Sequence, residues 1–125
     1  MATQESTLNL NSILIGSAQA LVLAEFYERV IGRSADMSEG GYYGWQVGSS
    51  FLTVGEHSEV QGQAKEPARI ILNFETKDVP AEFERLKGLG VRVIKEPYGM
   101  DDGWIATLAD PDGNLIQLMT PFEMG

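Results

Sequence analysis

Hydrophobic and polar positions follow the order strand, helix, strand, strand, and this order occurs twice along the chain. Alternation predicts a first strand over Leu8–Gly16. Apolar residues at three- and four-residue spacings then predict a helix over Gln19–Ile31, which Gly32 is placed to end. A hairpin is expected to follow, because Gly48-Ser49 is a two-residue turn with glycine first, which is typical of β-hairpins. Its strands are expected at Tyr42–Val47 and Ser50–Gly55.

The second half repeats this plan. A strand is expected over Arg69–Glu75 and a helix over Val79–Leu89, with Asp78 as its N-cap. Three more strands are expected at Val91–Lys95, Gly103–Ala109 and Asn114–Thr120. Residues 57–67 are polar and aperiodic, which predicts a linker. We therefore predict one α+β domain over residues 1–125, built from two tandem βαβββ units at about 8–56 and 68–121.

The segment Asp110-Pro111-Asp112-Gly113-Asn114 predicts a tight hairpin between the last two strands. Proline presets φ for the first central position of a type I turn, and the glycine can take the left-handed conformation that closes the loop. If Asp110 lies opposite Asn114, then Thr107 lies opposite Gln117 on one face of the sheet. The same register places Ile105 opposite Met119.

Composition and charge exclude several classes of function. The net charge is −9, and the nine basic residues are scattered, which argues against a nucleic-acid partner. The chain has no cysteine, so neither a disulfide framework nor thiolate chemistry is available. It shows neither a membrane-spanning stretch nor a signal-peptide pattern. We expect a soluble, cytoplasmic protein that interacts with neither nucleic acid nor membrane.

Three segments give the chain a family resemblance. These are Phe26–Gly32 at the end of the first helix, Gly88–Val91 after the second, and Asp110–Asn114 before the last strand. With them the chain resembles the vicinal oxygen chelate superfamily, which includes glyoxalase I, bleomycin-resistance proteins and extradiol dioxygenases. The resemblance implies curved mixed sheets, or half-barrels, that enclose a cleft, and subunits that pair as a homodimer.

Catalytic members of that superfamily bind a divalent metal through His and Glu on the concave face of the sheets. By offset from local landmarks, the equivalent positions here are Ser12, Thr53, Ile71 and Gln117. Isoleucine has no donor atom, and neutral hydroxyl and amide oxygens are poor ligands for first-row metals. The sequence therefore predicts no metal at this site and no cofactor.

Strand alternation still predicts which side chains line a cleft. The expected ligand-binding residues are Ser12, Gln46, Phe51, Thr53, Arg69, Ile71, Asn73, Ile105, Thr107, Gln117 and Met119. Apolar walls with a few polar groups are typical of a small-molecule pocket. The alternative is a closed barrel that these side chains simply fill. The opposite face, which includes Ile13, Ile70 and Leu118, is expected to pack against the helices.

Other candidate groups are open to two interpretations. His57 beside Glu56 is either an acid–base pair or a solvated turn, and so is the pair Asp101-Asp102. Trp104 falls on the helix-facing side by alternation, as do Trp45 and Tyr43, which favours core or interface packing over a stacking site. The segment Pro97-Tyr98-Gly99-Met100 is a candidate for a mobile rim over the cleft.

These observations leave three classes of function. The first is a protein of the bleomycin-resistance type that binds an apolar or aromatic metabolite or drug without chemistry. The second is an enzyme, a lyase, isomerase or dioxygenase-like member of the same superfamily, either metal-independent or with displaced ligands. The third is a degenerate regulatory or dimerisation domain. We favour binding, because an enzyme of this superfamily without its metal lacks its Lewis acid.

Overall fold

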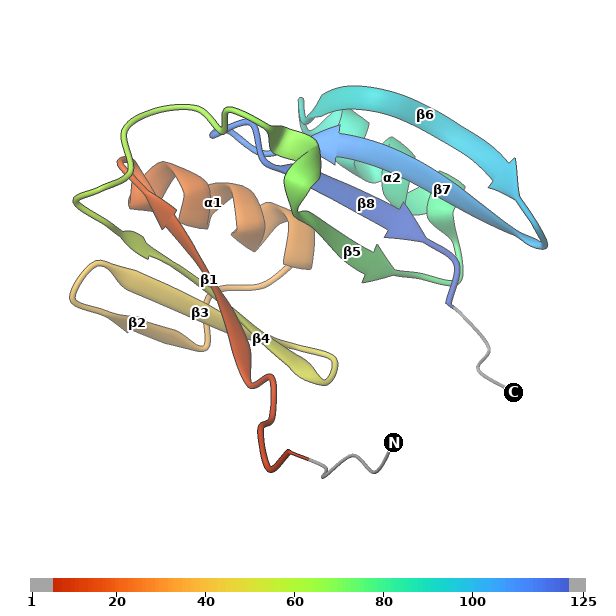
Figure 1. Ribbon diagram of the computed structural model, residues 1–125. Helices are drawn as coiled ribbons and strands as arrows, with labels where there is room; N and C mark the ends of the chain where they lie inside the picture. The colour runs from red at the N-terminus through yellow and green to blue at the C-terminus, as the bar shows by residue number, and fades with distance from the viewer. Residues whose placement is uncertain (1–5, 122–125) are drawn as a thin grey trace.

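The computed structural model of this chain describes residues 6–121, which form two four-stranded mixed sheets, each packed against one helix (Figure 1). The first unit contains β1 (Ser12–Ser17), α1 (Ala20–Ile31), β2 (Met37–Glu39), β3 (Tyr42–Val47) and β4 (Ser50–Glu56). The second contains the 3₁₀ turn η1 (Pro67–Arg69), β5 (Ile71–Glu75), α2 (Val79–Gly88), β6 (Arg92–Met100), β7 (Gly103–Ala109) and β8 (Leu115–Met119). The predicted α+β fold is confirmed.

The two sheets have equivalent strand orders, β1-β4-β3-β2 and β5-β8-β7-β6. In each unit the first strand pairs in parallel with the last, and the remaining pairs are antiparallel. Both β1 and β5 are therefore edge strands. This equivalence confirms the two tandem βαβββ units.

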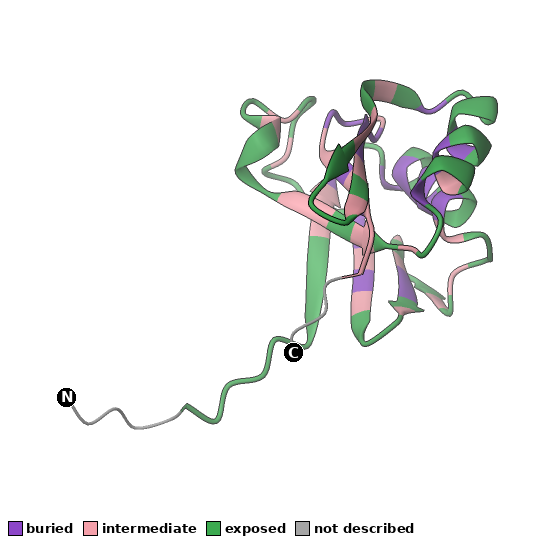
Figure 2. Cartoon of the chain, turned by 90° about the vertical axis from the view of Figure 1, so that its right-hand side faces the viewer, coloured by how far each residue is buried: buried purple, intermediate pink, exposed green. Residues whose placement is uncertain are grey.

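The core lies between each sheet and its helix. α1 contacts β1, β3 and β4, whereas α2 contacts β6, β7 and β8. Figure 2 shows the buried residues concentrated on the helix faces that look toward the sheets. The largest fully buried side chains are Trp45, Tyr27, Leu23, Leu86, Leu108, Ile116, Val54 and Val79. No helix within residues 6–121 is long and apolar enough to cross a membrane.

Local signals set the ends of the two helices as predicted. Gly32 follows α1 with φ of 89°, a left-handed conformation that glycine adopts without strain, and its N–H donates to the carbonyl of Glu28. Asp78 caps α2 by accepting a hydrogen bond from the Ala81 N–H at 3.1 Å. Gly48 also has a positive φ, 57°, in the β3–β4 turn.

Three predicted boundaries are wrong. β1 begins at Ser12, four residues later than predicted, because its pairing with β4 begins at the Ser12–Phe51 pair. Arg69 lies in η1, since Pro67 begins a helical turn, and Ile70 is 71% exposed instead of packing against a helix. Pro97–Met100 is part of β6 and not a loop, because irregular pairing with β7 extends that strand past Lys95.

Candidate functional site

The predicted cleft residues of the first sheet lie on its face away from α1. Ser12, Phe51 and Gln46 form one row across β1, β4 and β3, because each is the register partner of the next. Thr53 lies two residues along β4 on the same face, opposite Gly44. The Gln46 amide group donates to the carbonyls of Gly48 and Ser50 at 3.0 and 3.1 Å, so it holds its own hairpin together.

The second sheet carries a row of polar side chains on the face away from α2. Asn73, Gln117 and Thr107 are consecutive register partners on β5, β8 and β7, and Lys95 of β6 continues the row. The Gln117 amide nitrogen donates to the Thr107 hydroxyl oxygen at 3.4 Å. The predicted pairing of these two residues, and that of Ile105 with Met119, is confirmed.

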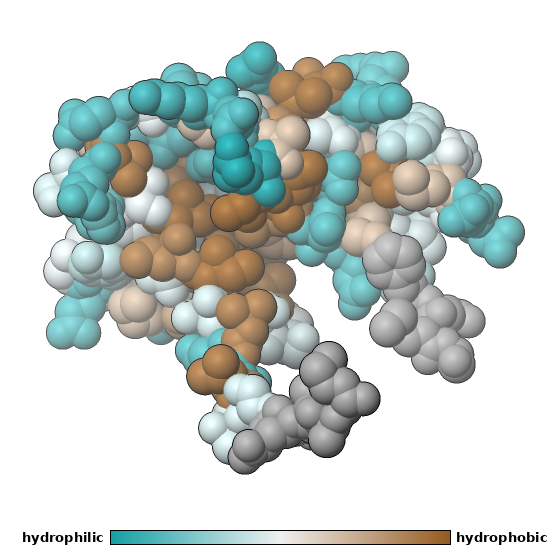
Figure 3. Space-filling view, viewed as in Figure 1, coloured by the Kyte–Doolittle hydropathy of each residue, from teal (hydrophilic) through white to brown (hydrophobic). Residues whose placement is uncertain are grey.

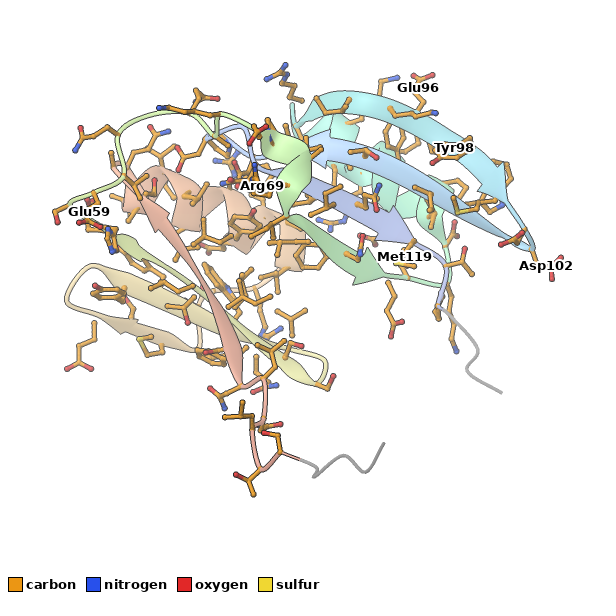
Figure 4. All side chains as sticks on the ribbon, viewed as in Figure 1. Glu59, Arg69, Glu96, Tyr98, Asp102 and Met119 are labelled. Atoms are coloured by element: carbon orange, nitrogen blue, oxygen red, sulfur yellow. The ribbon has the colours of Figure 1, made fainter. Side chains whose placement is uncertain are left out.

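An apolar row lies beside this polar row. Ile105 of β7 is the register partner of both Met119 and Tyr98. The Lys95 ammonium group lies 4.2 Å from the centre of the Tyr98 ring, a cation–π contact between the two rows. In Figure 4 Met119 lies near the end of β8 and Tyr98 on β6.

The apolar row borders a hollow of about 540 Å³ at the β6–β7 hairpin. Its walls include Trp104, Ile105 and Met119, and the acidic residues Asp101 and Asp102 lie at its rim. The hairpin tip with Asp102 is labelled in Figure 4. The backbone N–H of Trp104 donates to the Thr120 hydroxyl at 2.9 Å, which fixes the backbone that carries the indole. We call this cavity the hairpin hollow.

A second cavity, of about 440 Å³, lies where the two units meet. It brings together Phe51 of the first sheet with Ile71 and Asn73 of the second. All of β5 lines it, together with Ile13 of β1 and the β3–β4 hairpin from residue 47 to 52. We call it the seam groove. Five of the predicted lining residues are thus divided between two cavities and do not surround one pocket.

Six predicted ligand-binding residues line neither cavity: Ser12, Gln46, Thr53, Arg69, Thr107 and Gln117. Arg69 forms an ion pair with Glu66 on η1, and both side chains are well exposed. Figure 4 shows Arg69 on the turn that precedes β5. Ser12 is exposed at the start of β1. Neither is among the residues that line the seam groove or the hairpin hollow.

The residues at the metal-binding positions of the superfamily do not fit a divalent transition metal. Ile71 has no donor atom, and the Gln117 amide nitrogen is directed to Thr107. Ser12 and Thr53 lie on the other sheet and could offer only hydroxyl oxygens. Within residues 6–121, no three His, Cys, Asp or Glu side chains gather closely enough to hold a metal ion.

The remaining candidate groups lie at the surface. His57 is exposed in the turn after β4, and its Nδ1 accepts a hydrogen bond from the Glu59 N–H at 3.2 Å. Asp101 and Asp102 form an exposed turn, in which Asp101 has a φ of 52°. Trp104 is 47% exposed instead of packing in the core, whereas Trp45 is buried and its indole N–H donates to the Arg33 carbonyl.

A buried polar cluster joins the two units at the predicted Asp110–Asn114 turn. The Tyr27 hydroxyl of α1 donates to Asp110 at 2.8 Å, and the Gln19 amide donates to Asp112 at 2.7 Å. Asp110 also accepts hydrogen bonds from the backbone of Asp112 and from the backbone and side chain of Asn114. Burial raises the pKa of the Asp110 carboxyl, although these hydrogen bonds oppose the shift. This cluster holds the units together.

Sequence reasoning missed Lys95 as a member of the candidate site, and it placed Tyr98 only in a rim over the cleft. The register of β6 with β7 shifts on both sides of Lys95, so simple alternation could not place these side chains. It also missed β2, whose three residues are too few for a periodic signal.

Comparisons with known proteins place this geometry in a family. A family model described as a glyoxalase-like domain matches residues 12–119. A search of curated proteins found no significant match. A glyoxalase/bleomycin resistance protein/dioxygenase family enzyme from Burkholderia phytofirmans PsJN is 20% identical, with a TM-score of 0.74 over 92% of this chain and 100% of that one.

Two other solved structures have the same fold. A glyoxalase-related enzyme from Fulvimarina pelagi is 18% identical, with a TM-score of 0.75 over 90% of this chain and 88% of that one. TioX from Micromonospora sp. ML1 is 11% identical, with a TM-score of 0.74 over 91% of this chain and 99% of that one.

Proposed function

Because this chain belongs to the glyoxalase-like domain family, we propose that it is a small-molecule-binding protein of that family, which holds an apolar or aromatic ligand in the hairpin hollow without a metal. The observation that carries the proposal is the contrast between two neighbouring rows of the second sheet. Ile105 and Met119 offer an apolar wall, and Thr107 and Gln117 offer neutral polar groups next to it.

The apolar side chains of the hollow, Trp104, Ile105 and Met119, support an apolar or aromatic ligand, and its acidic residues Asp101 and Asp102 disfavour an anionic one. Its volume of about 540 Å³ suits a small organic molecule. The exposed indole of Trp104 can stack on an aromatic ring, and burial of its free surface would favour binding. Thr107 is only 7% exposed, and its hydroxyl accepts a hydrogen bond from the Gln117 amide. A ligand would therefore contact Gln117 and not the Thr107 hydroxyl itself. These groups orient a ligand but supply no Lewis acid.

A binding assay with Nile red tests the proposal. This dye is uncharged and aromatic, and its fluorescence increases in apolar surroundings. We expect saturable binding by the wild type and at least a tenfold loss of affinity in Met119→Trp, because the larger side chain fills the hollow. The matched control is Ser38→Trp, which adds the same indole to exposed β2 of the other sheet. Equal loss in both variants, or no saturable binding by the wild type, would refute the proposed site.

The same protein samples distinguish a metal-free binding protein from an enzyme with displaced metal ligands. Thermal-shift measurements with zinc, nickel and iron, alongside a panel of aromatic compounds, show which class of ligand stabilises the fold. Stabilisation by the aromatic compounds alone supports a binding protein. Tight stoichiometric binding of one of the metals would instead support an enzyme with displaced ligands.

A further inference from the structure

A third cavity, of about 290 Å³, lies at the joint between the two units, and two arginines line it. Arg29 belongs to α1 of the first unit, and Arg92 belongs to β6 of the second. We call it the arginine cavity. It shares no lining residue with the hairpin hollow or the seam groove.

Both of these arginines have unused guanidinium groups. The three other arginines each form an ion pair with a carboxylate three residues away. They also donate all the hydrogen bonds that arginine side chains make within residues 6–121. Acidic residues outnumber basic ones by 18 to 9, yet no carboxylate in this part of the chain pairs with Arg29 or Arg92. Two positive charges that share a cavity repel each other, and an anion between them would remove this repulsion.

The carboxylates around the cavity do not take this place. Asp110 also lines it, but this residue is only 4% exposed, and its oxygens accept the hydrogen bonds of the buried polar cluster. Glu25 and Glu28 line an adjacent hollow together with Arg29. Glu28 accepts a hydrogen bond from the Ser34 hydroxyl, and Glu25 forms no ion pair with Arg29. The two guanidinium groups are thus available to a ligand from solution.

The other walls of the arginine cavity are largely apolar. They include the side chains of Phe26, Leu89, Val91 and Pro111. Leu89 is 45% exposed, so a ligand that covers it would gain free energy from the burial of apolar surface. The Gln63 amide donates to the Pro111 carbonyl at 2.9 Å, which ties the linker to one wall. Apolar walls with two cationic groups suit an organic anion.

The other two cavities are less suited to an anion. Figure 3 shows apolar surface in the middle of the view, over β1, β4 and β5, the strands that contribute to the seam groove. Glu75 is the one charged residue among those that line that groove, and the hairpin hollow has two carboxylates at its rim. The net charge of −9 repels anions as a whole, but salt at about 0.1 M screens charges more than about 10 Å away. The nearby arginines therefore dominate.

We propose that the arginine cavity binds a small organic carboxylate, which accepts hydrogen bonds from Arg29 and Arg92 and places its apolar body against Leu89. Guanidinium groups bind carboxylates through charge-assisted hydrogen bonds, often in pairs. Because the two arginines belong to different units, the ligand bridges the units and stabilises the folded chain. This second site does not rest on ligand binding in the hairpin hollow.

Calorimetric titration with 2-naphthoate, an aromatic carboxylate, tests the role of the arginines. The wild type should bind it saturably. Arg29→Gln and Arg92→Gln should each lose at least tenfold in affinity, because each removes charge-assisted hydrogen bonds to the carboxylate. The matched control is Lys77→Gln, which removes the same charge from the exposed segment between β5 and α2 and should bind as the wild type does. No saturable binding, equal affinity in all three variants, or a loss in only one arginine variant would overturn the proposal.

Two further compounds test the chemical class of the ligand. The neutral counterpart 2-naphthamide should bind at least tenfold more weakly than 2-naphthoate, because it offers no charge to the arginines. Inorganic phosphate should also bind at least tenfold more weakly, because it has no apolar body. If the amide binds as tightly as the acid, the cavity recognises the ring alone. If phosphate binds as tightly, the cavity recognises any anion. Either result would overturn the proposal.

Variants of the two cavities separate this site from the hairpin hollow. Met119→Trp should bind 2-naphthoate as the wild type does, and Arg29→Gln should bind Nile red as the wild type does. Loss of 2-naphthoate binding in Met119→Trp would place the carboxylate in the hairpin hollow and overturn the proposal. Failure of Nile red to bind the wild type would refute only the function proposed for that hollow.

Discussion

The hydroxyl group of Tyr27 donates a buried hydrogen bond of 2.8 Å to Asp110, which lies 83 residues later in the chain. The donor is on α1 of the first unit and the acceptor is in the β7–β8 turn of the second. Burial and the nearby Asp110 carboxylate raise the pKa of Tyr27 well above its ordinary value, so the hydroxyl remains protonated and can act as a donor. This bond makes the two units interdependent.

Tyr27→Phe should lower the free energy of unfolding by about 1.5–3 kcal/mol, the usual effect of losing a hydrogen bond to a charged group. The aromatic ring would keep its packing in the core, so the loss of stability measures the contribution of the hydroxyl group alone. Urea denaturation provides the measurement. Tyr43→Phe is the control, because within residues 6–121 the Tyr43 hydroxyl makes no hydrogen bond to another residue. Equal stability of both variants would show that the units do not depend on this bond.

The stability of the protein should also respond to the raised pKa of Asp110. Because the folded state holds this proton more tightly than the unfolded chain, the stabilising contribution of the proton is complete below the ordinary pKa of 3.8 and is lost as the pH rises through the folded pKa. The Asp110→Asn variant lacks this titration. Its stability relative to the wild type should therefore increase as the pH rises from 3.8. A decrease over that range would contradict the account.

Gly55 tests the register of the first sheet. A Cβ at this position would lie 2.2 Å from the ring of Tyr42, its partner across β3 and β4. Gly55→Ala should therefore destabilise the protein by about 1–3 kcal/mol, as overpacking does. Gly99→Ala, also in a strand, has no atom within 4 Å of the added carbon and should change stability by less than about 0.5 kcal/mol. Thermal unfolding of both variants measures the difference.

Elemental analysis tests the conclusion drawn from the metal-binding positions. Since Ile71 and Gln117 cannot replace His and Glu as ligands, the purified protein should hold far less than one equivalent of zinc, nickel or iron. Treatment with a chelator should then leave the melting temperature unchanged. One tightly held equivalent per chain would show that ligands gather at a place that sequence offsets did not identify.

The fold could be predicted because local signals agreed with the tertiary structure. The Asp110–Asn114 turn fixes the register of β7 and β8, and thereby the pairing of Thr107 with Gln117. Apolar periodicity located α1 and α2, and Gly32 and Asp78 located two of their ends. Each of these features depends on residues close together in the sequence.

The site could be predicted only in part, because it depends on contacts between distant segments. The two-residue alternation of apolar positions assigned Arg69 to a strand, although Pro67 starts a helical turn that includes Arg69. The irregular pairing around Lys95 concealed its place in the polar row of the second sheet. Nor could sequence spacing show that only five of the predicted residues line the two cavities, since that depends on how the two units pack.

Methionine methyl groups report most directly on ligand binding at the hairpin hollow. Met100 and Met119 line this hollow, whereas Met37 lies on β2 of the other sheet and serves as an internal reference. With ¹³C-methyl-labelled methionine, we expect titration with Nile red to shift the signals of Met100 and Met119 saturably and to leave that of Met37 in place. Shifts at Met37 instead, or no saturable shift at the other two, would contradict the central claim that this hollow binds an apolar small molecule.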